Sequence, residues 1–280
     1  MNSTIICPSI SDFSFYEIKT EAQAVVFSVF WFVCLTLEMF FSVQTYRFFS
    51  SGIALSKSWI LRVIYVELHA SIILELFYLP GGLICYNMYL YNTIGPLFVF
   101  FRNQAFFLLL YYMLWANRSL PHNKAVHTSL EISIIVAKIL YLISFTICMC
   151  FMHILEKLFY YSYNSAAVVG LLAIYVVIVS IKQYYAIKQV MPKEAEKIRY
   201  QWIIITLLLS FIYAFWVINA LFIYTKVATF KNKSINAALY FVTAHTIIDV
   251  LPCILLILFT KLQHSSSVGS KGEPLITIDS

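Results

Sequence analysis

The sequence predicts an all-α membrane protein built as a bundle of seven transmembrane helices. Of its 280 residues, 61% are hydrophobic and only 11% are charged, whereas soluble domains carry about 25% charged residues. The apolar residues form long unbroken runs, which are typical of membrane helices rather than of short alternating strands. A soluble chain this apolar would lack the polar residues to cover its core, which disfavours a soluble enzyme.

Seven apolar runs approach the roughly 20 residues that cross the hydrocarbon core of a bilayer. They span Ala24–Phe48, Trp59–Ile84, Pro96–Trp115, Leu130–Leu155, Ala166–Tyr185, Trp202–Tyr224 and Ile235–Leu262. The first lies between Glu21 and Arg47, the second follows Lys57, and the third stops at Asn117-Arg118-Ser119. No internal repeat is visible, which argues against an inverted-repeat transporter.

The Lys and Arg residues of the short loops predict the orientation. With the N-terminus outside, the inner loops and the tail hold Arg47, Lys57, Arg118, Lys124, Lys182, Lys188, Lys193, Lys197, Arg199, Lys261 and Lys271. The outer segments hold Lys19, Lys157, Lys226, Lys231 and Lys233, and Arg102 is expected near the outer end of the third helix. This bias predicts that the N-terminus lies outside and the C-terminus in the cytosol.

Three regions follow from this orientation. Residues 1–23 form an extracellular N-terminus, residues 24–262 the helix bundle, and residues 263–280 a polar, Ser-rich cytosolic tail that is expected to be disordered. No cleavable signal peptide is expected, because no basic segment precedes an apolar core with a cleavage site. The net charge of +6 is dispersed beside the apolar runs, which indicates contact with anionic lipids rather than with nucleic acid.

Two glycosylation motifs agree with this orientation. Asn2 and Asn232 each begin an N-x-S/T sequence, and both lie outside. Asn117 begins a third such sequence, but it is expected at the inner end of the third helix, where it would not be glycosylated.

Several ionisable residues lie at membrane depth, where charge is costly. Glu67 lies about 15 Å along its helix from Lys57, and Asp249 lies about 18 Å from Lys261 at 1.5 Å per residue. His245 is one turn from Asp249, on the same face, and Pro252 is expected to bend this helix.

We expect Glu67, His245 and Asp249 to form one buried polar cluster, and three interpretations of it stay open. It is a structural hydrogen-bonded lock, a switch or cation site, or a transport or proton path. Glu38 and Lys138 are also deep, and we expect them to snorkel or to pair with neighbours without an assigned role.

Aromatic residues of the sixth helix have two interpretations. Tyr213, Trp216 and Asn219 either pack within the bundle or line a ligand pocket. No enzyme motif is present, since HExxH, GxSxG, P-loop and GxGxxG sequences are all absent. Neither the histidines nor the six cysteines have the spacing of metal ligands. We therefore predict no enzymatic activity, no cofactor and no metal.

Three stretches resemble one family of membrane receptors. LLLYYMLWANRSLP, SWILRVIYVE and HTIIDVLPCILLILFTKL are similar to the third-helix end, the second-helix start and the seventh helix of the serpentine receptor class gamma family of nematode chemosensory receptors. The resemblance implies a seven-helix bundle of the G-protein-coupled-receptor type. It also implies that Arg118 occupies the place of the arginine in the Asp-Arg-Tyr motif of rhodopsin-like receptors, with Asn117 replacing the acid.

The resemblance further implies signalling to a heterotrimeric G protein. The expected contact is formed by Asn117, Arg118 and the inner loop with Lys193, Lys197 and Arg199, an arrangement that a solvated helical loop also satisfies. The ligand is an unknown small molecule or peptide. The outer loop 156–165 lacks the cysteine of the usual receptor disulfide, and Cys7 and Cys85, both outside, are candidates to pair instead.

Two other functions remain as alternatives. One is a membrane transporter or channel that uses Glu67, His245 and Asp249 as a relay. The other is a membrane adaptor that does not signal. Signalling that depends on Arg118 distinguishes the receptor from both, whereas flux that depends on Asp249 indicates the transporter.

Overall fold

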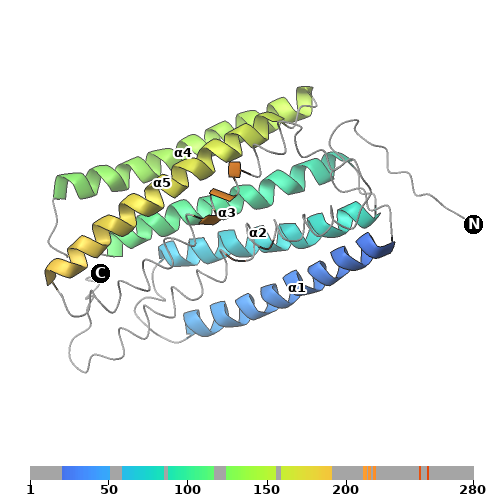
Figure 1. The fold of residues 1–280 in the computed structure, drawn as a ribbon, viewed down its shortest axis with the longest axis horizontal. Coiled ribbons are helices and arrows are strands. Elements are labelled where there is room, and N and C mark those ends of the chain that lie inside the picture. The colour runs from blue at the N-terminus through green and yellow to red at the C-terminus, as the bar shows by residue number, and fades with distance from the viewer. Residues whose placement is uncertain are drawn as a thin grey trace, which may run out of the picture.

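A computed structural model gives the arrangement of the first five helices (Figure 1). These are α1 (Glu21–Ser50), α2 (Trp59–Ile84), α3 (Met88–Ala116), α4 (Lys124–Leu155) and α5 (Phe159–Val190). The structure describes these ranges and, beyond them, only Phe211, Ile212, Ala214, Phe215, Val217, Ile218, Thr246 and Leu251. All of the described residues are helical, which confirms the predicted all-α class for this part of the chain.

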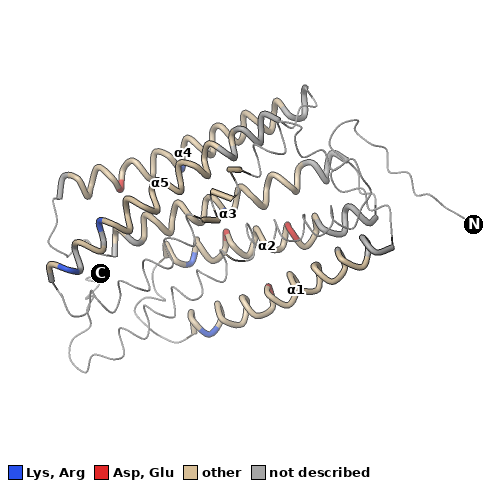
Figure 2. The backbone as a smooth tube through the Cα atoms, viewed as in Figure 1, with Lys and Arg blue, Asp and Glu red and all other residues tan. Residues whose placement is uncertain are grey.

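Three of the described helices are long and apolar enough to cross a membrane. The stretches are Ser28–Ser50 in α1, Thr93–Tyr112 in α3 and Val126–Phe151 in α4, and a shorter apolar stretch, Ala167–Lys182, lies in α5. The helix α2 is equally long but carries Arg62, Glu67 and Glu75 among its apolar residues. Figure 2 shows how thinly charge is spread along the helices. These helices indicate a membrane protein.

The helix α3 lies at the centre of the described bundle (Figure 1). It packs against α2, α4 and α5, whereas α1 packs against α2. Of the apolar stretch in α3, 67% is buried, compared with 22% for the stretches in α1 and α4. Every residue from Arg102 to Leu110 is buried, and a helix that is buried on all sides must be surrounded by other helices.

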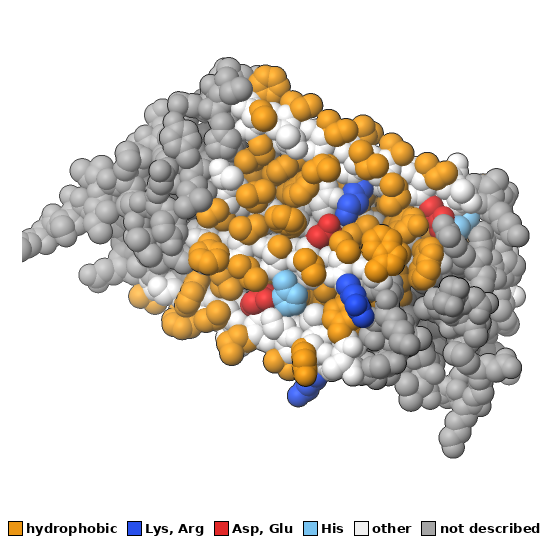
Figure 3. Space-filling view, turned by 180° about the vertical axis from the view of Figure 1, so that it is seen from behind, with side chains coloured by type: hydrophobic (Ala, Val, Ile, Leu, Met, Phe, Trp, Pro, Cys, Tyr) orange, Lys and Arg blue, Asp and Glu red, His pale blue; other side chains and the backbone are white. Residues whose placement is uncertain are grey.

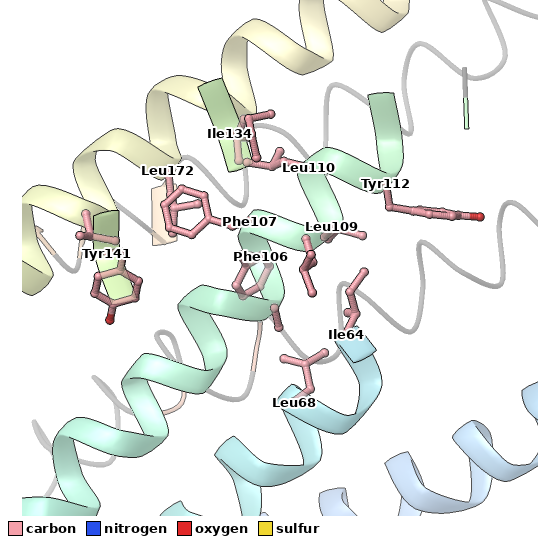
Figure 4. Packing of buried hydrophobic residues seen from close by; sticks show 14 of the residues in the cluster. Ile64, Leu68, Phe106, Phe107, Leu109, Leu110, Tyr112, Ile134, Tyr141 and Leu172 are labelled. Carbon is pink, nitrogen blue, oxygen red and sulfur yellow. The ribbon is translucent and has the colours of Figure 1, made fainter. Parts of the chain in front are cut away.

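The core is formed by side chains of α3 that pack against neighbouring helices. Figure 4 shows Phe106 and Leu109 facing α2, where they meet Ile64 and Leu68. On the opposite side of α3, Phe107 faces Leu172 of α5 (Figure 4). Relative to exposure to water, burial of such apolar side chains contributes a free energy of about 25 cal/mol per Å². In a membrane, the same contacts stabilise the bundle mainly through close packing.

The N-terminal end of α3 differs from the prediction. The apolar run was expected to start at Pro96, but α3 starts at Met88 and contains Pro96 in its interior. Proline there removes one backbone hydrogen bond, which a helix within a bundle tolerates. The longer helix places Arg102 near the middle of α3 rather than near its outer end.

Candidate functional site

An ion pair joins α2 to α4 across the central helix. The Lys138 ammonium donates to Glu67 Oε1 at 3.1 Å and to the backbone carbonyl of Gln104 on α3 at 3.5 Å. The exposed fractions of the Lys138 and Glu67 side chains are only 21% and 16%. Lys138 is central in the apolar stretch Val126–Phe151, so this one ammonium joins three helices near the middle of that stretch.

A second acid–base pair joins α1 to α2. His69 Nδ1 lies 2.5 Å from Glu38 Oε1, and His69 Nε2 lies 3.2 Å from the hydroxyl of Thr45. The imidazole also lies against the ring of Phe41, with centroids 4.5 Å apart. Both ring nitrogens of His69 therefore have partners on α1, and Glu38 pairs with a neighbour, which is one of the two alternatives expected for it.

The side chains of Glu67 and His69 point in different directions from α2 because of helical geometry. Glu67 and His69 are two positions apart, so they are separated by about 200° around the helix axis at 3.6 residues per turn. Glu67 reaches α4 and His69 reaches α1. Figure 3 shows the few acidic, basic and histidine side chains of one face lying among largely hydrophobic ones. The helix α2 is thus held from two sides by polar contacts.

Three consecutive polar residues occupy the middle of α3. Arg102, Asn103 and Gln104 are 2%, 0% and 4% exposed. The amide of Asn103 donates to the hydroxyl of Tyr141 on α4 at 3.2 Å. Polar groups buried this deeply are stable only with partners, since an unsatisfied one costs roughly 1–3 kcal/mol. This segment gives α3 a polar centre within an apolar helix.

A third group of ionisable residues lies between α4 and α5, near the start of α4. His127 Nε2 lies 3.2 Å from Glu131 Oε1, one helical turn away, and both side chains are buried. Lys182 of α5 lies close enough for its charge to interact with that of Glu131. Lys182 was expected in an inner loop, but α5 continues through it to Val190.

The predicted site residues are only partly covered by the structure. Glu67 is described and contacts Lys138, whereas His245 and Asp249, its partners in the predicted polar cluster, lie outside the described residues. All other predicted site residues lie outside the described residues or have undescribed side chains: His245, Asp249, Pro252, Asn117, Arg118, Lys193, Lys197, Arg199, Tyr213, Trp216, Asn219, Asn2, Asn232, Cys7 and Cys85. Their roles remain predictions.

The partners of Glu67 and Glu38 were not specified by sequence reasoning. A signal was present, because Lys138 and His69 are basic groups that lie within the apolar runs of later helices. Opposite charges at similar depth on neighbouring helices favour pairing, but the choice of neighbour depends on packing. Among the described residues, no group of three His, Cys, Asp or Glu side chains is placed to hold a metal ion.

Comparisons with known proteins do not add to this picture. No family model matches the chain, and no curated protein or solved structure matches it.

Proposed function

We propose that the chain is a seven-helix G-protein-coupled receptor of chemosensory type, similar to the serpentine receptor class gamma family. It resides in the plasma membrane with its N-terminus outside and its C-terminus in the cytosol. The observation that carries the proposal is the central position of α3, which is buried on all sides and ends at Ala116, directly before Asn117-Arg118. The resemblance implies that the inner end of this helix, at Asn117 and Arg118, contacts the G protein.

The proposed signalling surface lies at the inner ends of the helices. A ligand that binds between the outer halves of the helices favours a state in which Arg118 and the loop after α5 contact the G protein. The extension of α5 supports this proposal, because α5 continues past its apolar stretch Ala167–Lys182 to Val190. It thereby leads toward the basic residues Lys193, Lys197 and Arg199.

The sixth helix supplies the proposed ligand contacts at Tyr213, Trp216 and Asn219. Their described neighbours are consistent with an aromatic lining: Phe215 packs against the core, and its ring lies 6.4 Å from that of Phe211. The ligand is a small molecule or a peptide, and the pocket's aromatic character alone does not select between them.

Replacing Arg118 by alanine tests the proposal. We expect Arg118→Ala to abolish G-protein activation while leaving surface expression unchanged, because the arginine contacts the partner rather than the bundle. Activation is measured as nucleotide exchange on a reconstituted G protein, with constitutive activity as the signal where no ligand is known.

Arg47 provides a matched control. It lies in the last turn of α1 and is exposed, and it is also predicted at an inner helix end. Arg47→Ala removes the same charge from the same side of the membrane, so it should signal normally. Equal loss in both variants would reduce the role of Arg118 to orientation by the positive-inside rule, and normal signalling by Arg118→Ala would contradict the proposal.

A further inference from the structure

The backbone carbonyl of Leu76 in α2 lacks the donor that a helix normally supplies. In an α-helix each backbone N–H donates to the carbonyl four residues earlier. The residue four positions after Leu76 is Pro80, which has no N–H, although α2 continues past it to Ile84. A carbonyl freed in this way within a membrane bundle requires a donor from a neighbouring helix, a side chain or water.

Trp31 of α1 supplies this donor. Its indole Nε1 donates to the Leu76 carbonyl oxygen at 3.0 Å. Trp31 lies in the apolar stretch Ser28–Ser50 of α1, and its ring packs edge-on against that of Phe32, with centroids 5.3 Å apart. A tryptophan that only anchors a helix at the membrane surface directs its N–H toward water or headgroups. The bond to Leu76 therefore indicates a role inside the bundle.

A second bond from a side chain to a backbone carbonyl shows what is particular about Leu76. The hydroxyl of Ser71 donates to the carbonyl of Phe98 on α3 at 2.8 Å. The residue four positions after Phe98 is Arg102, so α3 itself has an N–H for that carbonyl. Ser71 adds a donor to a carbonyl that has one in its helix, whereas Trp31 replaces a donor that α2 lacks.

The sequence that follows Leu76 makes the end of α2 easy to bend. Pro80 is followed directly by Gly81 and Gly82, and proline and glycine are the two least favourable residues in a helix interior. Proline also removes a hydrogen bond that would hold its own turn to the preceding one. The position of residues 80–84 therefore depends on contacts with neighbouring helices.

We propose that Pro80 forms a hinge in α2, and that the hydrogen bond from Trp31 to the Leu76 carbonyl holds this hinge in one position. Trp31 is thus a positioning residue that acts through the carbonyl. When the bond is formed, α1 fixes the turn of α2 that precedes the hinge. When it is broken, the carbonyl turns toward another donor and residues 80–84 change their angle to the rest of α2. This inference does not rest on the proposed receptor function.

A double-mutant cycle between Trp31 and Pro80 tests the inference, with thermal unfolding of the whole chain in lipid nanodiscs as the measurement. Trp31→Phe removes the indole N–H and leaves the Leu76 carbonyl without a donor, so the Tm should fall by about 2–4 °C. Pro80→Ala gives α2 an N–H for the same carbonyl. In the Pro80→Ala background, Trp31→Phe should therefore lower the Tm much less than in the wild type.

Ser71→Ala provides the matched control. It also removes a hydrogen bond between a side chain and the backbone of another helix, but the carbonyl of Phe98 does not lie four residues before a proline. Its effect on the Tm should be the same in the wild-type and Pro80→Ala backgrounds. If Trp31→Phe also lowers the Tm equally in both backgrounds, its bond is not coupled to the proline, and the proposal is overturned.

Hydrogen exchange distinguishes a hinge from a general loss of stability. In Trp31→Phe, amide exchange should become faster in residues 81–84 and stay at the wild-type rate in residues 60–75, because the hinge lies between these two segments. Adding Pro80→Ala should return residues 81–84 to slow exchange. A uniform increase along α2, or no increase after Pro80, would contradict the hinge.

Solid-state NMR of the wild type keeps the proposal testable if a variant does not fold. The protein is isotope-labelled at the tryptophan indole nitrogens and at the leucine carbonyl carbons. We expect dipolar coupling between an indole nitrogen and a leucine carbonyl carbon at the separation that a hydrogen bond imposes. Absence of any such coupling would show that Trp31 does not bind the Leu76 carbonyl, which equally overturns the proposal.

Discussion

Gly95 of α3 is the position where a single added carbon has the clearest cost. A Cβ at Gly95 would lie 2.9 Å from Cε2 of Tyr78 on α2, and the Tyr78 ring is itself packed against Phe98, with centroids 5.5 Å apart. A ring held between two helices cannot swing away as the end of a flexible side chain does. The close approach of α2 and α3 at this level therefore requires glycine.

We expect Gly95→Ala to destabilise the protein by about 1–3 kcal/mol, the usual cost of overpacking. Gly170 of α5 is the matched control, because no atom lies within 4 Å of a Cβ built there. Gly170→Ala should leave stability unchanged or raise it by up to about 1 kcal/mol through its better helix propensity. Thermal unfolding of both variants in nanodiscs checks the pair, and equal effects would show that the Tyr78 contact does not limit packing.

At the scale of elements, the sequence predicted helices better than their contacts. The bounds of α2, Trp59–Ile84, match the predicted apolar run at both ends. The start of α3 differs, because the helix begins at Met88, before the predicted apolar run Pro96–Trp115, and holds Pro96 in its interior. A sequence pattern reflects the conformational preference of a short segment, whereas packing within the bundle determines where the helix begins and ends.

The ion pair between Glu67 and Lys138 gives the same lesson for the site. Depth along each helix was readable from the sequence, and it identified Glu67 as a buried polar residue. The rotation of α2 and α4 around their axes was not readable, because helices with apolar residues on all sides have no strong polar face. For this reason Lys138 was recognised as deep but was not assigned to Glu67.

We expect Lys138→Met to destabilise the bundle by roughly 3 kcal/mol, the lower end of the range for breaking one side of a buried ion pair. The reason is that Glu67 is left at membrane depth without its partner. The double variant Glu67→Leu with Lys138→Met should recover most of this loss, since no charge then remains. A double-mutant cycle of unfolding free energies measures the coupling, and additive losses would show that the two residues act independently.

At the scale of the whole molecule, the order of the helices along the chain matches their order in space. The described pairs that pack most closely are successive ones, together with α3 and α5. A bundle of this kind alternates direction from one helix to the next, so the side of each loop follows from the side of the first. One experimentally placed loop therefore orients every described helix.

The predicted orientation has a direct test in glycosylation. We expect glycans on Asn2 or Asn232 in protein from a eukaryotic membrane, because the extracellular side passes through the compartment where the modification occurs. A tag on the C-terminus should react with antibody only after permeabilisation. A glycan on Asn117 would reverse the assignment of the third helix end, and Asn117→Gln provides the control for that site.

The polar centre of α3 also bears on how the protein is made. A translocating helix is released into lipid according to its own hydrophobicity, and an arginine at its centre costs about 2.5–3.5 kcal/mol on the scale of insertion experiments. Arg102, Asn103 and Gln104 occupy that centre, so α3 is a poor candidate to enter the bilayer alone. Its neighbour α4 carries the hydroxyl of Tyr141, to which Asn103 donates, and the ammonium of Lys138, which donates to the backbone carbonyl of Gln104. Biogenesis should therefore hold α3 in the translocon until α4 has been synthesised, which makes α3 and α4 a single unit of insertion.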